Sequence, residues 1–180
     1  FARLVEAYYE MIYRLAIKML NNPQDAEDIL QETFIKAYRK LKNFDGRSNL
    51  STWLYRIATN EALMFLRKRK PDPVSIDETI DTGEGEQSPL HIVDWGNLPE
   101  DELMSEEAQV YLNQAIESLS PSLRVVFILR DIQGLSTRET SNVLDLSEMA
   151  VKTRLSRARL RLREELSTYY GDRVVERKHV

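Results

Sequence analysis

The hydrophobic positions along this 180-residue chain follow a helical period in two blocks, one before residue 70 and one after residue 105. In both blocks apolar side chains recur three or four positions apart, the spacing that gathers them on one face of an α-helix. No segment has the alternation of apolar and polar residues that is typical of a half-buried strand. The pattern predicts an all-α protein.

Helix boundaries follow from the periodic runs and their breakers. The first block predicts helices over Leu4–Leu20, Gln24–Leu41 and Thr52–Arg69. The last block predicts helices over Ser105–Ser118, Ser122–Ile132, Thr137–Leu144 and Glu148–Tyr169. Asn21-Asn22-Pro23 ends the first helix, since proline lacks a backbone N–H. Ser136 and Glu139 have the spacing of a capping box at the start of the helix that follows them.

The segment between the blocks is rich in helix breakers. Lys70–Pro89 holds three prolines and two glycines and has no sustained period. We therefore expect an acidic flexible linker over 71–101 between two small helical domains, 1–70 and 102–180. The linker is either a solvating spacer or an extended segment that threads a basic channel in a partner. The apolar residues of Leu90–Trp95 favour the second reading, because a spacer would not need them.

Charge is segregated along the chain, although the net value is only −4. Residues 1–70 carry 13 basic and 8 acidic side chains, a net of +5. Residues 71–107 carry no Lys or Arg and 12 acids. Residues 108–180 carry 12 basic and 9 acidic side chains, a net of +3. This asymmetry says more about the partners of the chain than its overall pI does.

Composition narrows the chemistry further. The chain has no cysteine and only two histidines, His91 and His179, so we expect neither disulfides nor a metal site. There is no nucleophile–base constellation and no glycine-rich phosphate loop, so we expect neither an enzyme nor a cofactor. No apolar run is long enough to cross a bilayer, and no signal peptide is visible in a chain that starts at Phe1 rather than methionine. We expect a cytoplasmic protein without membrane insertion.

The last predicted helix carries KTRLSRARLRLRE, six basic residues ahead of a single acid. At 100° per residue, one arc holds the apolar side chains Val151, Leu155, Ala158, Leu162 and Leu166. The opposite arc holds Met149, Thr153, Ser156 and Leu160, with Lys152 and Arg157 at its edges. Short hydroxyls flanked by cations are what a helix needs in the major groove of DNA, to reach base edges and phosphates.

Only Asp145–Ser147 separates this basic helix from the short capped helix before it. Two helices joined so tightly, the second basic on its exposed face, predict a DNA-binding helix-turn-helix. Arg130 ends the helix before the motif, where its side chain could reach a neighbouring phosphate. The alternative is an antiparallel helical hairpin with a solvated basic face.

The helix Gln24–Leu41 has one apolar side and one charged side. The charged side carries Asp28, Gln31, Glu32, Ile35 and Arg39. An isoleucine exposed among carboxylates is either an ordinary surface residue or part of a docking face for a partner helix that carries arginines. A carboxylate metal site from Asp25, Glu27, Asp28 and Glu32 is excluded, because Glu27 points about 100° away from the other three.

The helix Thr52–Arg69 has a polar arc, with Trp53 at its edge. The arc contains Thr52, Arg56, Thr59, Asn60 and Arg67. Amide, hydroxyl and cation beside an aromatic ring, after a loop with glycine and serine, suit the capture of an unstacked base. The alternative is a core tryptophan and a solvated stripe. Glu61 falls on the otherwise apolar side without a predicted partner.

Three motifs, DAEDILQETFIKAY, STWLYRIATN and LSTRETSNVLDLSEMAVKTRLSRARLRLRE, occur in this order. Together they resemble the extracytoplasmic-function (group 4) sigma factors of the bacterial sigma-70 family, and the resemblance covers essentially the whole chain. It implies a factor that binds core RNA polymerase, recognises −35 and −10 promoter elements and directs transcription initiation of a stress or envelope regulon. Met64, Met149 and Ala150 depart from the usual residues of the family, which leaves the promoter preference open.

The resemblance also implies residue roles and partners. The −35 duplex would be read by Arg130, Lys152, Thr153, Ser156 and Arg157. The −10 element would be opened by Phe44, Ser51, Trp53, Arg56 and Asn60. The polymerase clamp helices of subunit β′ would bind Asp28, Gln31, Glu32 and Ile35. The polymerase β flap would be a second contact, and an anti-sigma factor would hold the protein inactive.

A conventional helix-turn-helix regulator is the rival interpretation within DNA binding. Such a protein binds intact operator duplex, usually as a dimer. It would need neither the Trp53–Asn60 surface nor the acidic face around Asp28. The segregated charge adds one hypothesis, that the two domains fold together around the linker and mask their DNA surfaces until polymerase separates them.

Overall fold

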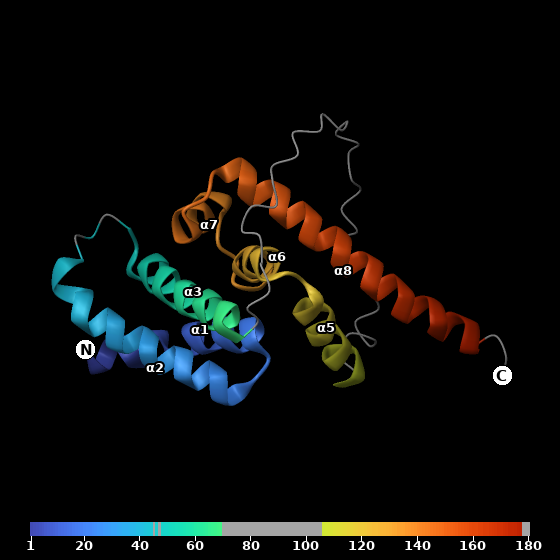
Figure 1. Cartoon of the computed structure of the whole chain (residues 1–180), viewed down its shortest axis with the longest axis horizontal. Coiled ribbons are helices and arrows are strands. Elements are labelled where there is room, and N and C mark those ends of the chain that lie inside the picture. Colours follow the sequence, from blue (N-terminus) through green and yellow to red (C-terminus); the bar gives the residue numbers. More distant parts are fainter. Residues whose placement is uncertain (45, 47, 70–105, 178–180) are drawn as a thin grey trace.

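The computed structural model describes residues 1–44, 46, 48–69 and 106–177, and the regular structure in these residues is helical (Figure 1). This confirms the predicted all-α class. The predicted linker, 71–101, lies outside the described residues, and both interpretations of it stay predictions. The domain bounds 1–70 and 102–180 likewise stay predictions.

Three helices form the N-terminal group: α1 (Ala2–Leu20), α2 (Pro23–Lys40) and α3 (Leu50–Arg69). A single 3₁₀ turn, η1 (Leu41–Asn43), continues the chain after α2. Each of the three helices packs against the other two. Their apolar sides form a common core in which Ile12, Leu15, Ala26, Leu54 and Ala58 are buried. The predicted boundaries of these helices hold to within two residues, because apolar periodicity and breakers agree at each end.

The turn between α1 and α2 is built from the predicted breakers. Asn21 has a left-handed φ of 50°, and its N–H closes the C-terminus of α1 by donating to the Ile17 carbonyl at 2.8 Å. Asn22 then caps α2, since its side-chain oxygen accepts a 3.1 Å hydrogen bond from the N–H of Asp25. Pro23 occupies the first turn of α2, where no N–H is needed.

The C-terminal group contains α5 (Glu106–Ser118), α6 (Pro121–Phe127), α7 (Thr137–Leu144) and α8 (Glu148–Arg177). Two helix ends in the structure differ from the predicted ones. The helix expected over Ser122–Ile132 becomes α6 followed by a π-helical segment, η3 (Ile128–Ile132). Helix α8 continues to Arg177 rather than Tyr169, because the residues after Leu166 extend the helix without an apolar stripe that could signal it.

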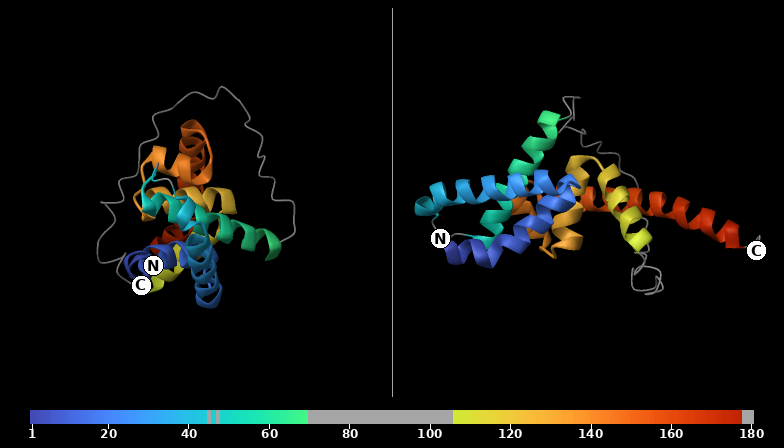
Figure 2. Two further views of the ribbon diagram at one scale, coloured as in Figure 1. Left: turned by 90° about the vertical axis from the view of Figure 1, so that its left-hand side faces the viewer. Right: turned by 90° about the horizontal axis from the view of Figure 1, so that it is seen from below.

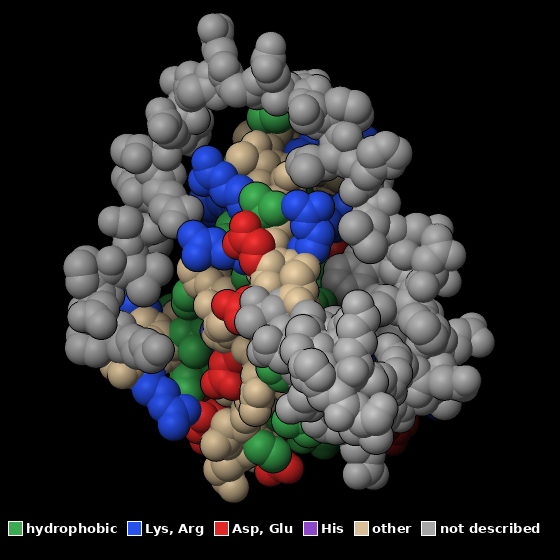
Figure 3. Space-filling model, turned by 90° about the vertical axis from the view of Figure 1, so that its right-hand side faces the viewer, with side chains coloured by type: hydrophobic (Ala, Val, Ile, Leu, Met, Phe, Trp, Pro, Cys, Tyr) green, Lys and Arg blue, Asp and Glu red, His purple; other side chains and the backbone are tan. Residues whose placement is uncertain are grey.

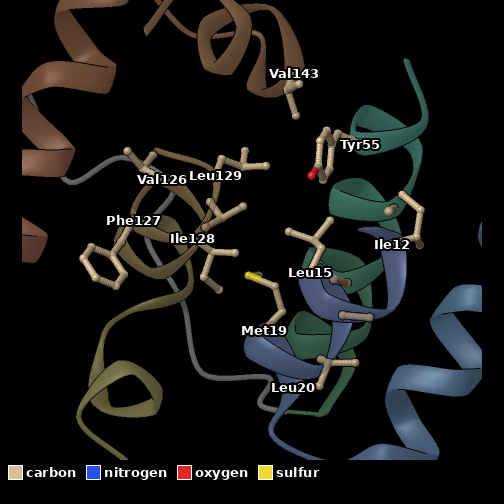
Figure 4. Close-up of a cluster of buried hydrophobic side chains, with 14 of the residues drawn as sticks. Ile12, Leu15, Met19, Leu20, Tyr55, Val126, Phe127, Ile128, Leu129 and Val143 are labelled. Atoms are coloured by element: carbon tan, nitrogen blue, oxygen red, sulfur yellow. The ribbon is translucent and has the colours of Figure 1, made fainter. Parts of the chain in front are cut away.

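The two groups of helices pack on each other through one hydrophobic core (Figure 4). Helix α1 contacts α5, α6 and η3, and α3 contacts α6 and α7. Figure 2 shows α8 extending away from this body toward the C-terminus. The part of the hypothesis that the two groups pack together is therefore confirmed, whereas the masking of the DNA surfaces and their release by polymerase stay predictions. Among the described residues, the contacts at the junction are apolar side-chain packing and hydrogen bonds.

Glu61, which had no predicted partner, forms an ion pair inside the N-terminal group. Its carboxylate lies 2.6 Å from the Lys36 ammonium of α2, and the Glu61 side chain is only 13% exposed. The hydrogen bond to Glu61 raises the pKa of Lys36 above its ordinary value of 10.5. The pair joins α2 to α3 at a site where an isolated carboxylate would be costly to bury.

Replacing Lys36 with methionine is expected to lower the free energy of unfolding by about 1 to 2 kcal/mol, because Glu61 is left without its partner. Since folding raises the pKa of Lys36, the stabilisation is present below pH 10.5 and is lost as the pH rises through the raised value. Urea denaturation at neutral and alkaline pH measures both effects. Lys42→Met, on the exposed η1 turn, is the matched control. Equal midpoints for the two variants would contradict the role of the pair.

Candidate nucleic-acid and partner interfaces

Helices α7 and α8 form the predicted helix-turn-helix. Ser136 caps α7: its hydroxyl accepts from the N–H of Glu139 at 3.1 Å, and its own N–H donates to the Glu139 carboxylate at 2.7 Å. The predicted capping box is confirmed. The same backbone N–H of Ser136 lowers the pKa of Glu139, so the cap contributes stability above the usual glutamate range and loses it as the pH falls.

The turn between α7 and α8 uses local hydrogen bonds. Asp145 has a left-handed φ of 55°, and its N–H donates to the Ser141 carbonyl. The Ser141 hydroxyl donates to the Leu146 carbonyl at 2.5 Å. Ser147 then accepts a 3.1 Å hydrogen bond from the N–H of Ala150, which caps the start of α8. These bonds fix the direction in which α8 leaves the turn.

Removing the Ser136 hydroxyl by Ser136→Ala is expected to destabilise the helix-turn-helix by about 1 kcal/mol, because the N–H of Glu139 loses its acceptor. Amide hydrogen exchange should show faster opening of α7 than in the wild type. Asn142→Ala, at an exposed position on the same helix, provides the control. Unchanged protection of α7 in the Ser136 variant would contradict the capping role.

The two faces of α8 are divided as the sequence predicts. Val151, Ala158 and Leu162 are fully buried, and Leu155 is nearly so. On the other side are the four predicted duplex-reading residues of this helix, all exposed: Lys152, Thr153, Ser156 and Arg157. Because they occupy the first turns after the tight turn, the structure presents hydroxyls and cations together at one end of α8.

Two further basic side chains near the helix-turn-helix, Arg130 and Arg159, make hydrogen bonds to other residues of the C-terminal group. The Arg130 guanidinium donates to the Leu135 carbonyl, and its Nε is buried without a hydrogen-bond partner in the described residues. Arg159 makes two bonds to the carboxylate of Asp131, at 2.8 and 2.7 Å, and this pairing raises its pKa. In this structure Arg130 supports the loop before α7, and its predicted contact with a neighbouring phosphate stays a prediction.

One face of the described surface carries mixed charge. Figure 3 views the molecule from that side, and basic and acidic side chains lie next to one another on it. Such a mixture does not favour a polyanion in the way that a one-signed face does. The candidate duplex-reading face is the first turns of α8, in the stretch Met149–Arg163, whose sequence contains six basic residues and no Asp or Glu.

The predicted base-capture residues gather around the start of α3. The rings of Phe44 and Trp53 lie 5.1 Å apart, centroid to centroid, with a tilt of 45°. Ser51 is half-buried, whereas Arg56 and Asn60 are exposed on the following turns. The structure thus places the Phe44–Trp53 pair near the start of α3, the helix that also exposes the Arg56 guanidinium and the Asn60 amide. Loop residues 45 and 47 lie outside the described residues.

The polar arc predicted on α3 is narrower than expected. Thr52 and Thr59 are buried, at 7% and 0% exposure, so they do not belong to an open polar surface. They share a stripe with Tyr55, and Figure 4 shows the Tyr55 ring next to Val143 of α7. The sequence could not reveal this, because α7 comes from the other group of helices. Arg56, Asn60 and Arg67 remain exposed.

The predicted docking face of α2 is present on the surface. Asp28 and Gln31 are exposed, Glu32 is partly exposed and pairs with Lys36 at 3.4 Å, and Ile35 is 44% exposed. An apolar side chain thus stands among acidic and amide groups on one helical face. This combination suits a partner surface that offers an apolar contact with cations around it.

Several residues that join the two groups of helices had no role predicted from the sequence. Arg124 is 7% exposed and donates to the Met19 carbonyl of α1 at 2.6 Å. Tyr55 donates to the side-chain oxygen of Gln133 at 2.9 Å, and burial raises the pKa of Tyr55 to about 12, so its hydroxyl stays protonated. The sequence does contain a signal for the role of Arg124, because this arginine lies inside the apolar run LRVVFIL and is therefore expected to be buried.

The described residues contain neither a metal-binding cluster nor a helix that could span a membrane. No group of three or more His, Cys, Asp or Glu side chains there could hold a metal ion. None of the helices in the described part of the chain is both long and apolar enough to span a membrane.

Comparison with protein families gives two matches. Residues 4–71 match the model of sigma-70 region 2, and residues 109–162 match the model of sigma-70 region 4. Among curated proteins, the chain is 42% identical to the ECF RNA polymerase sigma factor SigW of Bacillus subtilis over 92% of this chain and 88% of that protein. It is 36% identical to the RNA polymerase sigma-H factor of Pseudomonas aeruginosa, over 88% of this chain and 82% of that protein.

Solved structures with a similar fold include two proteins in complexes, of which the first is a sigma factor. One is RpoE bound to the anti-sigma factor NepR from Bartonella quintana, with a TM-score of 0.66 and 28% identity over 93% of this chain and 96% of that one. The other is CnrH in complex with the cytosolic domain of CnrY, with a TM-score of 0.65 and 26% identity over 93% of this chain and 87% of that one. Both matches span the two groups of helices.

Proposed function

Because this chain belongs to the sigma-70 family, as an extracytoplasmic-function RNA polymerase sigma factor, we propose that its two groups of helices divide promoter recognition between them. The C-terminal group reads the −35 element as duplex DNA, and the N-terminal group engages the −10 element and the polymerase. The protein recruits the enzyme and carries out no chemistry of its own.

The observation that carries this proposal for the −35 element is the face of α8. Lys152, Thr153, Ser156 and Arg157 are exposed at the start of a helix whose other face is buried and whose direction is fixed by two capped turns. A helix held in this way can enter the major groove, where hydroxyls and cations reach base edges and phosphates. Arg130 supports this reader from within the domain, through its bond to the Leu135 carbonyl.

At the −10 element, the N-terminal group traps a base that has left the stack. The Phe44–Trp53 pair offers an aromatic surface, and Asn60 and Arg56 offer hydrogen bonds and charge on the next turns of α3. Extruding a base costs a few kcal/mol, which pocket contacts offset. Ser51 contributes a hydroxyl at the start of the same helix.

Docking on core polymerase uses the face of α2. Ile35 supplies the apolar contact, and Asp28, Gln31 and Glu32 supply acidic and amide partners for arginines on the β′ clamp helices. The C-terminal group makes the second contact, with the β flap. An anti-sigma factor controls the protein, and the similar sigma factor RpoE solved with the anti-sigma factor NepR supports this part of the proposal.

The test is to mix the purified chain with bacterial core RNA polymerase, isolate the complex, and run transcription on a library of promoters. Binding with promoter-selective transcripts would support the proposal and give the recognised sequence. Tight binding to duplex DNA without polymerase binding would instead favour a conventional helix-turn-helix regulator.

A further inference from the structure

The start of α8 exposes an apolar side chain, Met149. It is 69% exposed, which makes it the most exposed large apolar side chain among the described residues. Single apolar residues are common on protein surfaces, so exposure alone gives Met149 no role. The position of Met149 on α8 and the groups around it are what distinguish it.

Met149 lies in the middle of the proposed duplex-reading face. At 100° per residue, Met149 shares an arc of about 60° with Thr153, Ser156 and Leu160. The buried Val151 lies on the opposite side of the helix. Met149 therefore faces in the same direction as the two hydroxyls that are proposed to reach base edges.

The backbone that carries Met149 is fixed by the cap of α8. The Ser147 hydroxyl accepts from the N–H of Ala150 at 3.1 Å, and the Ser147 carbonyl accepts from the N–H of Val151 at 3.0 Å. Met149 thus occupies the first turn of α8, at the end of the helix that lies next to α7 (Figure 1). Helical side chains lean toward the N-terminus, so the Met149 side chain extends ahead of Thr153. The N-terminal turn of a recognition helix is the part that contacts base edges.

The charged side chains near Met149 lie beside its arc and not within it. Lys152 and Arg157 are exposed on its two sides, about 60° and 80° around the helix from Met149. Glu148, the adjacent acid, is exposed about 100° away, on the side of Lys152. Cations at the edges of a reading face suit phosphates, whereas the centre of the face lies over the bases.

The chemistry of a thioether restricts what Met149 can recognise. Its sulfur has no hydrogen to donate and is only a weak acceptor, so it cannot read the donors and acceptors of a base edge. In the major groove, thymine alone adds an apolar group to that pattern, its C5 methyl. Removing this methyl from water against a flexible, polarisable side chain is favourable.

We propose that Met149 reads the C5 methyl group of a thymine in the −35 duplex and so determines the sequence preference at one base pair. This inference rests on the proposed reading of the −35 element by α8. It adds an apolar contact to a face whose other members, Thr153, Ser156 and the flanking cations, act through hydrogen bonds and charge.

Deoxyuridine differs from thymidine only by the absence of the C5 methyl, and it therefore tests this contact directly. In a cognate promoter, each thymine of the −35 element, on either strand, is replaced in turn by deoxyuridine. Binding is then measured for the full chain in complex with core polymerase. At one position the wild type should lose affinity about fourfold, the effect expected for one methyl group in an apolar contact. A wild-type protein without any methyl-sensitive position would overturn the inference.

Three variants test whether Met149 makes the contact. Met149→Gln keeps a long, helix-favouring side chain but has a polar end, so it should bind the thymine and deoxyuridine promoters equally. Met149→Leu should keep the preference for the methyl group. Leu160→Gln is the matched control: Leu160 is 39% exposed on the same arc. It lies about 16 Å further along α8, more than the width of the major groove of about 12 Å, so the methyl effect should stay fourfold.

Two results for Met149→Gln would contradict the assignment. A methyl effect as large as that of the wild type would show that another residue contacts the thymine. A loss of affinity that is equal for the thymine and deoxyuridine promoters would overturn the methyl contact and would indicate that Met149 contacts a protein surface instead.

Failure of this inference can be distinguished from failure of the proposed function. Promoter-selective transcription without a methyl difference between the wild type and Met149→Gln would keep the sigma function and overturn the Met149 contact. If the chain binds duplex DNA but not core polymerase, the same scan is read on the duplex alone. A methyl effect there that Met149→Gln abolishes would support the contact while the sigma function fails. Absence of sequence-selective DNA binding in both assays would overturn both.

Discussion

Arg157→Ala is expected to reduce promoter-selective transcription about tenfold, with a loss of discrimination at the upstream element of about 1 to 3 kcal/mol if the guanidinium makes a bidentate contact to a base. Arg157 is exposed on the proposed reading face of α8, beside Ser156 and one turn after Lys152. The measurement is run-off transcription on cognate and −35-substituted promoters, together with duplex binding at two salt concentrations.

The matched control for this variant is Arg163→Ala, which removes the same charge from an exposed position nearly two turns further along α8. A phosphate contact would weaken binding to all sequences alike and reduce its salt dependence. Loss of discrimination would point to a base contact instead. Transcription that is unchanged by Arg157→Ala would remove this residue from the reader.

Ile35→Asp is expected to weaken binding to core polymerase about thirtyfold or more, as is usual when an apolar anchor at the centre of an interface is lost. Ile35 is 44% exposed, so the substitution should leave the fold intact. It lies one helical turn from Gln31, on the face that also carries Asp28. Competition against a labelled sigma factor for core polymerase gives the affinity without involving DNA.

Met64→Asp is the control for Ile35→Asp, because Met64 is 46% exposed on α3 and lies outside the proposed docking face. Thermal unfolding of both variants should match the wild type. Equal polymerase affinities for the two variants would contradict the assignment of the α2 face. A loss confined to Ile35→Asp would support it and would distinguish docking from promoter binding.

The helix-turn-helix is the part of the molecule that local sequence predicts best. The capping box at Ser136, the tight Asp145–Ser147 turn and the two faces of α8 all appear in the structure as expected. Each depends on residues within a few positions of one another, so the pattern contains the information. The resemblance to a family added the roles, which periodicity alone could not supply.

The end of α8 and the π-helical segment after α6 mark the limits of that local information. Nothing in the pattern signals that the helix continues to Arg177, since the residues there show no apolar stripe. The change at Ile128 from α-helix to π-helix likewise has no breaker in the sequence. The sequence predicts that a helix is present, whereas the signals that mark its last residue are weak.

By itself, therefore, the sequence determined the all-α class, the order of the helices and the faces that α2 and α8 expose. Tertiary structure alone decided which polar residues are used inside the molecule. Glu61 forms an ion pair with Lys36, Arg124 donates a hydrogen bond to the Met19 carbonyl, and Thr52 and Thr59 are buried. Each outcome joins different helices of the chain, and a helical period reports only on which side of its own helix a residue lies. The packing of the helices determines which residues that side contacts.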